Sequence, residues 1–71
     1  MRLFEELTER EEEVLHYLSL GRSNPQIATQ LGVSPHTVHN HTKSIFRKLN
    51  VRGRVLASQM YQQRMPRQPV E

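Results

Sequence analysis

The chain has 71 residues, 35% of them hydrophobic, which is enough for one small core and not for a second domain. It leaves little room for an enclosed active site, and no nucleophile has an evident base beside it, so we expect no enzyme. The absence of cysteine excludes a disulfide framework and a thiolate zinc site. The apolar runs are too short to span a membrane, and we expect a cytoplasmic protein without a membrane partner.

The net charge of +3 is the difference between two segments of opposite sign. Residues 1–22 carry three arginines and six glutamates, whereas residues 23–71 carry seven lysines and arginines and one glutamate. No acidic side chain occurs between Ser23 and Val70. This segregation indicates a protein that presents one basic face to a polyanion such as nucleic acid.

Capping residues and apolar periods predict four helices, and hence an all-α fold. The first helix is predicted over about 9–20. Thr8 with Glu11 three residues later is a capping-box pattern, and Gly21 is placed to end the helix in a left-handed cap.

A short second helix is predicted over 25–31. Asn24 is its expected N-cap, because a residue before proline is disfavoured in the helical region and Pro25 suits the first helical position. Gly32 is the expected stop. A helix of this length is stable only against neighbouring elements.

The third helix is predicted over 35–49, from a cap at Ser34 to a left-handed cap at Asn50. Together with the second helix it forms a helix-turn-helix unit. At 100° per residue, one face of this helix is polar and lacks any carboxylate. That face consists of His36, His39, Asn40, Lys43 and Arg47.

A fourth helix is predicted over 54–64, with Gly53 as a tolerable cap. It has two apolar stripes, formed by Leu56 with Met60 and by Ala57 with Tyr61. One stripe can pack on the domain, and the other is exposed unless something covers it. We expect Leu56 and Met60 to mediate a homodimer.

The remaining segments set the boundaries of the domain. Residues 1–6 are interpreted as an N-terminal arm, and 7–64 as the helix-turn-helix domain. Two prolines and the lack of any period predict a disordered tail over 65–71.

The polar face of the third helix suits the major groove of DNA, which admits an α-helix. Asn40 can make a bidentate pair with adenine, and Lys43 can donate to guanine. Base contacts are predicted for His36, His39, Asn40 and Lys43. Phosphate contacts are predicted for Ser34, Thr37, Arg47, Lys48, Arg52 and Arg54. For Ser34 the capping role is the stronger expectation, because the cap uses the same oxygen.

The histidines raise the question of a metal site. Only His36 and His39 share a face, and no Cys, Asp or Glu is close in sequence to complete a ligand shell. We therefore expect no metal and no cofactor. His41 lies beside Val38 and Ile45 and is expected to be half-buried.

The chain from Leu7 to Tyr61 resembles the helix-turn-helix domain of the LuxR family of bacterial transcription regulators. The matching text is Leu-Thr-Glu-Arg-Glu-Glu-Glu-Val-Leu at 7–15, Gly21, Ser-Asn-Pro-Gln-Ile-Ala at 23–28, Thr-Val-His-Asn-His at 37–41, Ile45, Lys48, Leu49, Arg54 and Ala57. The resemblance implies that the third helix enters the major groove, that positions 39, 40 and 43 read bases, and that the fourth helix mediates dimerisation. His39 departs from the Lys or Arg common in the family, as Glu12 and Gly53 depart at their positions.

Three functions fit these features. The leading one is a sequence-specific transcription regulator that binds double-stranded DNA as a dimer. Such a protein would be associated with the nucleoid when bound, and RNA polymerase is a second candidate partner. Another is a module of RNA polymerase like sigma-factor region four, which has a comparable Thr-Val spacing. A third is a protein-interaction module that works through the fourth helix, but such a module has no need to exclude carboxylates.

Overall fold

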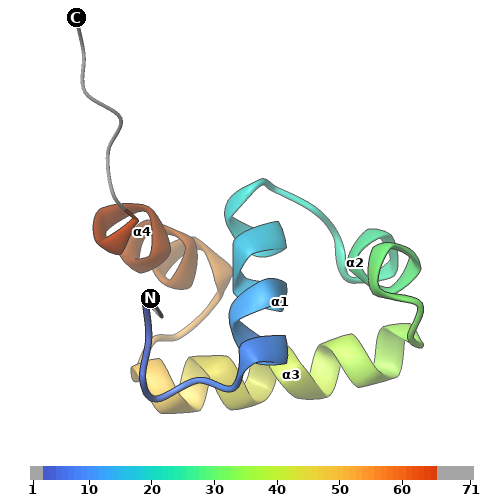
Figure 1. Cartoon of the computed structure of the whole chain (residues 1–71), viewed down its shortest axis with the longest axis horizontal. Coiled ribbons are helices and arrows are strands. Elements are labelled where there is room, and N and C mark those ends of the chain that lie inside the picture. Colours follow the sequence, from blue (N-terminus) through green and yellow to red (C-terminus); the bar gives the residue numbers. More distant parts are fainter. Residues whose placement is uncertain (1–2, 66–71) are drawn as a thin grey trace, which may run out of the picture.

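The structure, a computed structural model, describes residues 3–65. These residues form four helices and no strand, which confirms the all-α helix-turn-helix architecture. The helices are α1 (Glu9–Ser19), α2 (Asn24–Leu31), α3 (Pro35–Leu49) and α4 (Arg54–Arg64). In Figure 1, α3 lies along the bottom, and α1 stands above it between α4 on the left and α2 on the right.

Helix α1 begins at the predicted capping box. Thr8 Oγ1 accepts the Glu11 N–H at 3.1 Å, and Glu11 Oε1 accepts the Thr8 N–H at 2.9 Å. The helix ends at Ser19, one residue earlier than predicted, and Gly21 follows with a φ of +79°. That angle is in the left-handed region, where glycine pays no Cβ penalty.

Helix α2 begins one residue earlier than predicted, and the predicted N-cap at Asn24 was wrong. The N-cap is Ser23, whose Oγ accepts the Gln26 N–H at 3.3 Å, while Gln26 Oε1 accepts the Ser23 N–H at 2.9 Å. Asn24 would have had Ile27 three residues later, and isoleucine has no side-chain acceptor to complete a capping box. Asn24 is therefore the first helical residue.

Helix α3 has the predicted bounds. Ser34 Oγ accepts the Thr37 N–H at 3.1 Å at its start, and Asn50, with a φ of +55°, is its left-handed C-cap. Gly32, with a φ of +70°, ends α2 just before the turn. Only the C-cap Gly32, Val33 and the N-cap Ser34 thus separate α2 from α3, and this short connection gives the helix-turn-helix a tight turn.

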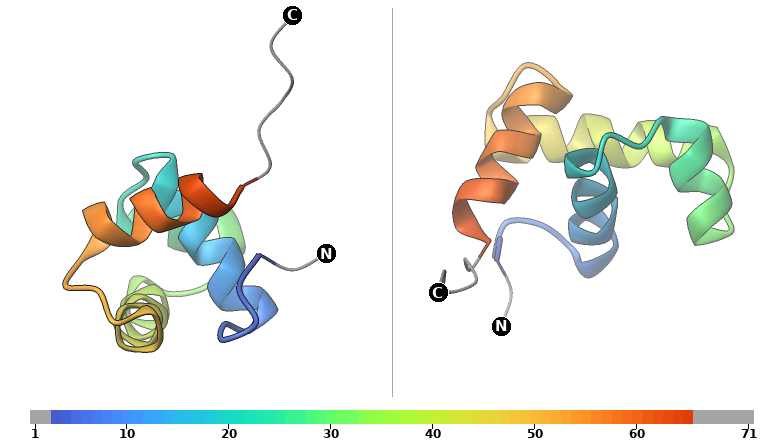
Figure 2. Two further views of the ribbon diagram at one scale, coloured as in Figure 1. Left: turned by 90° about the vertical axis from the view of Figure 1, so that its left-hand side faces the viewer. Right: turned by 90° about the horizontal axis from the view of Figure 1, so that it is seen from above.

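Helix α4 also has the predicted bounds and packs on α1. Its N-cap is Gly53, which offers no side-chain hydrogen bond. Ala57 and Tyr61 are buried, and the Tyr61 hydroxyl lies 2.9 Å from His16 Nδ1 on α1. The right-hand view in Figure 2 shows α4 and α1 on the same side of α3.

The core extends beyond the predicted start of the domain at residue 7. Phe4, assigned above to an N-terminal arm, is fully buried, stacks on Tyr61 at 6.3 Å and lies under the Arg64 guanidinium at 4.3 Å. Phe4 lies outside every predicted helix, so its burial in the core could not be predicted from a helical pattern of apolar residues. The tail predicted over 65–71 lies, apart from Met65, outside the described residues.

The Glu11 carboxylate is the main polar connection between α1 and α3. Only 5% of Glu11 is exposed, and its Oε1 lies 2.8 Å from Lys48 Nζ. Its Oε2 accepts a hydrogen bond from Ser44 Oγ at 2.6 Å. Ser44 and Lys48 are four residues apart and share one side of α3, so this carboxylate fixes which side of α3 faces α1.

These contacts determine the ionisation of Glu11. Burial by itself raises the pKa of the carboxyl, but hydrogen bonds from Lys48, Ser44 and the Thr8 backbone lower it to about 2. A buried charge is stabilising only when it is paired and hydrogen-bonded, and Glu11 has both kinds of partner.

We expect the free energy of unfolding to fall as the pH is lowered from 4.5 toward about 2. The folded pKa of Glu11 is below the ordinary glutamate value of 4.5, so its contribution to stability is present above that pH and is lost as the folded carboxylate is protonated. Glu11→Gln should remove most of this acid sensitivity and lower the unfolding free energy at neutral pH by about 1–3 kcal/mol. Denaturant unfolding over a pH series measures both effects.

The matched control is Glu13→Gln. Glu13 lies two residues along α1, is exposed, and has Arg10 at 3.7 Å as its one ion-pair partner among residues 3–65. This substitution should change the unfolding free energy by less than about 0.5 kcal/mol. An unchanged acid transition in Glu11→Gln would contradict the role assigned to Glu11.

Candidate nucleic-acid interface

The polar face of α3 is open to solvent, as the helical period predicts. All five of its residues are exposed: His36, His39, Asn40, Lys43 and Arg47. The buried residues of α3 are Val38, Thr42, Ile45 and Leu49. In Figure 1 the other helices all lie above α3, and no helix of the described chain covers its lower side.

This face combines hydrogen-bonding groups with positive charge. Asn40 carries both a donor and an acceptor at its amide, and the imidazole of His39 can supply either, depending on its tautomer. Lys43 and Arg47 are four residues apart and add two cations. Since α3 contains no carboxylate, nothing on this helix offsets their charge. Such a surface attracts phosphates and can hydrogen-bond to base edges.

Two hydroxyl groups lie at the N-terminal end of the face. Ser34 Oγ accepts the Thr37 N–H, which confirms its capping role, and it also lies 3.0 Å from Thr37 Oγ1. The N-terminus of a helix carries a partial positive charge and unpaired N–H groups that suit an anion. Ser34 and Thr37 therefore lie where a phosphate could approach the start of α3.

Lys48 lies on a different side of α3 from its neighbour Arg47. One residue further along a helix is a rotation of about 100°, which turns Lys48 toward α1, where its ammonium binds Glu11. The Lys48 ammonium thus has a partner within the domain, and its phosphate contact stays a prediction. Arg47 is exposed and keeps the predicted orientation.

The arginines between α3 and α4 also differ from each other. Arg54 donates to the Arg22 carbonyl oxygen at 3.1 Å and to Asn24 Oδ1 at 2.9 Å. It thereby fastens the start of α4 to the segment between α1 and α2. Arg52 is exposed in the turn that precedes α4. Of the two predicted phosphate contacts, Arg52 is the one whose surroundings suit that role.

The outer side of α4 carries exposed apolar side chains. Leu56 is 47% exposed, but Met60, predicted to lie in the same interface, packs partly against the core. Val55 is 67% exposed and was missed from the sequence, because it belongs to neither apolar stripe. The apolar surface is therefore centred on Val55 and Leu56, near the start of α4.

The histidines of α3 are distributed as predicted. His36 and His39 are exposed, and His41 is half-buried. Within residues 3–65, no three His, Asp or Glu side chains are grouped so that they could hold a metal ion. Among the same residues, no helix is long and apolar enough to cross a membrane.

Comparison with known proteins gives a family match over most of the chain. Residues 5–61 match the model of the luxR family of bacterial regulatory proteins. That span contains all four helices except the last turn of α4.

Similarity to individual proteins also covers most of the chain. The chain is 52% identical over 60 residues to the nitrate/nitrite response regulator protein NarP of Escherichia coli, covering 84% of this chain and 28% of that protein. It is 47% identical over 55 residues to a nitrate/nitrite response regulator protein homolog of Haemophilus influenzae, with coverages of 78% and 26%. It is 43% identical over 51 residues to the CsgBAC operon transcriptional regulatory protein of Escherichia coli, with coverages of 72% and 24%. The chain spans about a quarter of the length of these relatives.

Proposed function

The chain belongs to the luxR family of bacterial regulatory proteins, and we propose that it binds double-stranded DNA as the recognition domain of a transcription regulator. The observation that carries this proposal is the exposed, acid-free face of α3. A helix with this composition can enter the major groove, hydrogen-bond to bases and neutralise phosphates. The role is one of binding and not of catalysis.

The relatives support a role in transcription. Their names describe nitrate/nitrite response regulators and an operon transcriptional regulatory protein. The match to the luxR family over residues 5–61 also favours such a regulator over a module like sigma-factor region four. Bound to DNA, the protein would lie on the bacterial nucleoid, and RNA polymerase is a candidate protein partner.

Base recognition is proposed for the exposed residues in the first two-thirds of α3. Asn40 would pair with adenine, Lys43 would donate to guanine, and His39 would donate to or accept from a base edge. His36, one turn before Asn40, would contact a base or a phosphate at the edge of the groove. An imidazole cannot make the two parallel hydrogen bonds of a guanidinium. We therefore expect the base preferred opposite His39 to differ from the one preferred by a family member with arginine at this position.

Phosphate contacts are proposed around this helix. Arg47 and Arg52 would supply charge, and Ser34 and Thr37 would hold a phosphate at the N-terminus of α3. Lys48 and Arg54 are assigned instead to positioning, Lys48 through Glu11 and Arg54 through Asn24. Their charges add to the local potential without needing direct contact.

Dimerisation is proposed through the outer side of α4. Val55 and Leu56 form an exposed apolar surface near the start of this helix. A dimer would place two α3 helices on successive turns of one face of the DNA, which predicts a two-part site.

DNA affinity should fall steeply with salt, with a slope of about −0.9 on logarithmic axes for each phosphate neutralised. Arg47→Gln should weaken binding to all duplexes alike and reduce the size of the slope by about 1. The control substitution is Arg22→Gln, at an exposed arginine outside the proposed interface, and it should leave the slope closer to that of the parent protein. Fluorescence anisotropy over a salt series measures both, with folding checked by circular dichroism.

Two results would contradict this proposal. Binding that does not depend on salt would show that phosphates are not the main partner. A loss of slope in Arg22→Gln as large as in Arg47→Gln would mean that the DNA-facing surface differs from the one proposed.

Leu56→Glu should shift the protein toward monomer, because a carboxylate would be placed in the proposed apolar interface. Leu20→Glu is the control, since Leu20 is also an exposed leucine, 53% accessible, and lies at the end of α1 and not on α4. Sedimentation equilibrium of both variants and the parent measures the mass. An unchanged mass for Leu56→Glu would reject α4 as the interface.

A further inference from the structure

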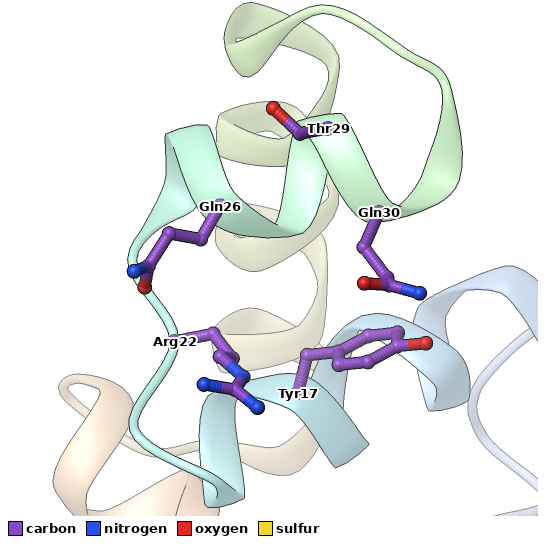
Figure 3. Close-up of a pocket in the computed structure, with 5 residues that line it drawn as sticks. All are labelled: Tyr17, Arg22, Gln26, Thr29 and Gln30. Atoms are coloured by element: carbon purple, nitrogen blue, oxygen red, sulfur yellow. The ribbon is translucent and has the colours of Figure 1, made fainter.

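A pocket lies between α1 and α2, outside the proposed DNA-binding surface. Its volume is about 290 Å³, and it is lined by Tyr17, Arg22, Gln26, Thr29 and Gln30. Figure 3 shows Tyr17 and Arg22 on one side of the pocket and the side chains from α2 on the other. Neither α4 nor α3 contributes a lining residue.

The lining is rich in hydrogen-bond donors and has no carboxylate. Within residues 3–65, the Arg22 guanidinium and the Gln30 amide have no hydrogen-bond partner, although both residues are exposed. Gln26 uses its Oε1 for the Ser23 cap, which leaves its two amide hydrogens for another acceptor. Thr29 donates its hydroxyl hydrogen to the Pro25 carbonyl oxygen. These exposed donors are therefore available to an acceptor, and the guanidinium favours an anionic one.

The size of the pocket limits its occupant. A volume of about 290 Å³ is at the lower end for ligand pockets, which suits one or two side chains of a polypeptide. The Tyr17 ring provides apolar surface beside the polar groups, as Figure 3 shows. A glutamate or aspartate side chain has both an apolar stem and a carboxylate, and so matches the ring and the guanidinium together.

The pocket faces away from the DNA-binding surface. In Figure 3, α3 passes behind α2, with the pocket in front. The right-hand view of Figure 2 agrees, since α1 and α2 are in front and α3 is more distant. An occupant of the pocket would therefore not compete with DNA for the exposed face of α3.

We infer that the pocket formed by Tyr17, Arg22, Gln26, Thr29 and Gln30 binds a carboxylate side chain from an acidic segment of a partner protein. Arg22 pairs with the carboxylate, and the Gln26 amide donates a second hydrogen bond to it. The Gln30 amide bonds to the backbone of the same segment, and the Tyr17 ring packs against its aliphatic stem. This inference does not depend on DNA binding, because the pocket and α3 use different side chains.

The test is a nuclear magnetic resonance titration of the 71-residue chain labelled with ¹⁵N. The probe is an acetylated and amidated peptide of sequence Ala-Glu-Glu-Leu-Glu-Ala, and its matched control has glutamine in place of each glutamate. The acidic peptide should shift the Gln26 and Gln30 side-chain amides and the Arg22 Nε–H saturably, and the glutamine peptide should not. Arg22→Gln should weaken this binding about tenfold or more, because a charge-assisted contact is lost.

Control variants and ligands separate the pocket from general attraction to basic surface. Arg47→Gln removes a charge from the exposed face of α3 and should leave the affinity for the peptide unchanged. Arg22→Gln should in turn leave DNA affinity within about twofold of the parent, since Arg22 lies outside the proposed interface. Glutarate, a free dicarboxylate, should bind more weakly than the peptide because it has no peptide backbone with which the Gln30 amide could form a hydrogen bond.

Several outcomes would overturn the inference. Shifts confined to α3, equal shifts with the glutamine peptide, or equal affinity in Arg22→Gln would each show that the pocket does not select a carboxylate. Glutarate binding as tightly as the peptide would assign the pocket to a small anion. A loss of DNA affinity in Arg22→Gln as large as in Arg47→Gln would place Arg22 in the DNA interface. None of these results alters the salt dependence on which the proposed DNA-binding function depends.

Discussion

The buried carboxylate of Glu11 is the constraint on which the geometry of this domain depends. It completes the cap of α1 through Thr8 and binds Ser44 and Lys48 on α3, at distances between 2.6 and 2.9 Å. Apolar packing alone permits a helix to rotate or slide to some degree, whereas a hydrogen-bonded ion pair has one geometry. By holding one side of α3 against α1, Glu11 determines that the opposite side is presented to solvent.

The same Glu11–Lys48 contact also determines which positive charges of α3 are exposed. Glu11 uses the one cation of α3 that points inward, and the remaining cations of that helix, Lys43 and Arg47, are exposed. The glutamates are confined to the first part of the chain, apart from Glu71. The net charge of the whole protein is modest, but the surface formed by α3 is basic because the two signs belong to different elements.

Local sequence patterns predicted the elements well, since caps and periods act over three or four residues. Ser34 and Asn50 bound α3 as predicted, and the one wrong cap arose because Ser23 has a capping-box partner that Asn24 lacks. Contacts distant in sequence were not predictable. Lys48 is 37 residues from Glu11, so its side chain could be assigned to DNA or to the interior with equal reason until the packing was known. The same holds for Arg54 and for the burial of Phe4.

The central claim is that the exposed face of α3 reads base sequence in duplex DNA, and selection of bound duplexes from a random pool tests it most directly. The parent protein should enrich two related half-sites about one helical turn apart. Asn40→Ala should lose preference at one position of each half-site, at a cost of about 1–3 kcal/mol. A pool that shows no enrichment, or the same motif for the parent and for Asn40→Ala, would contradict the account.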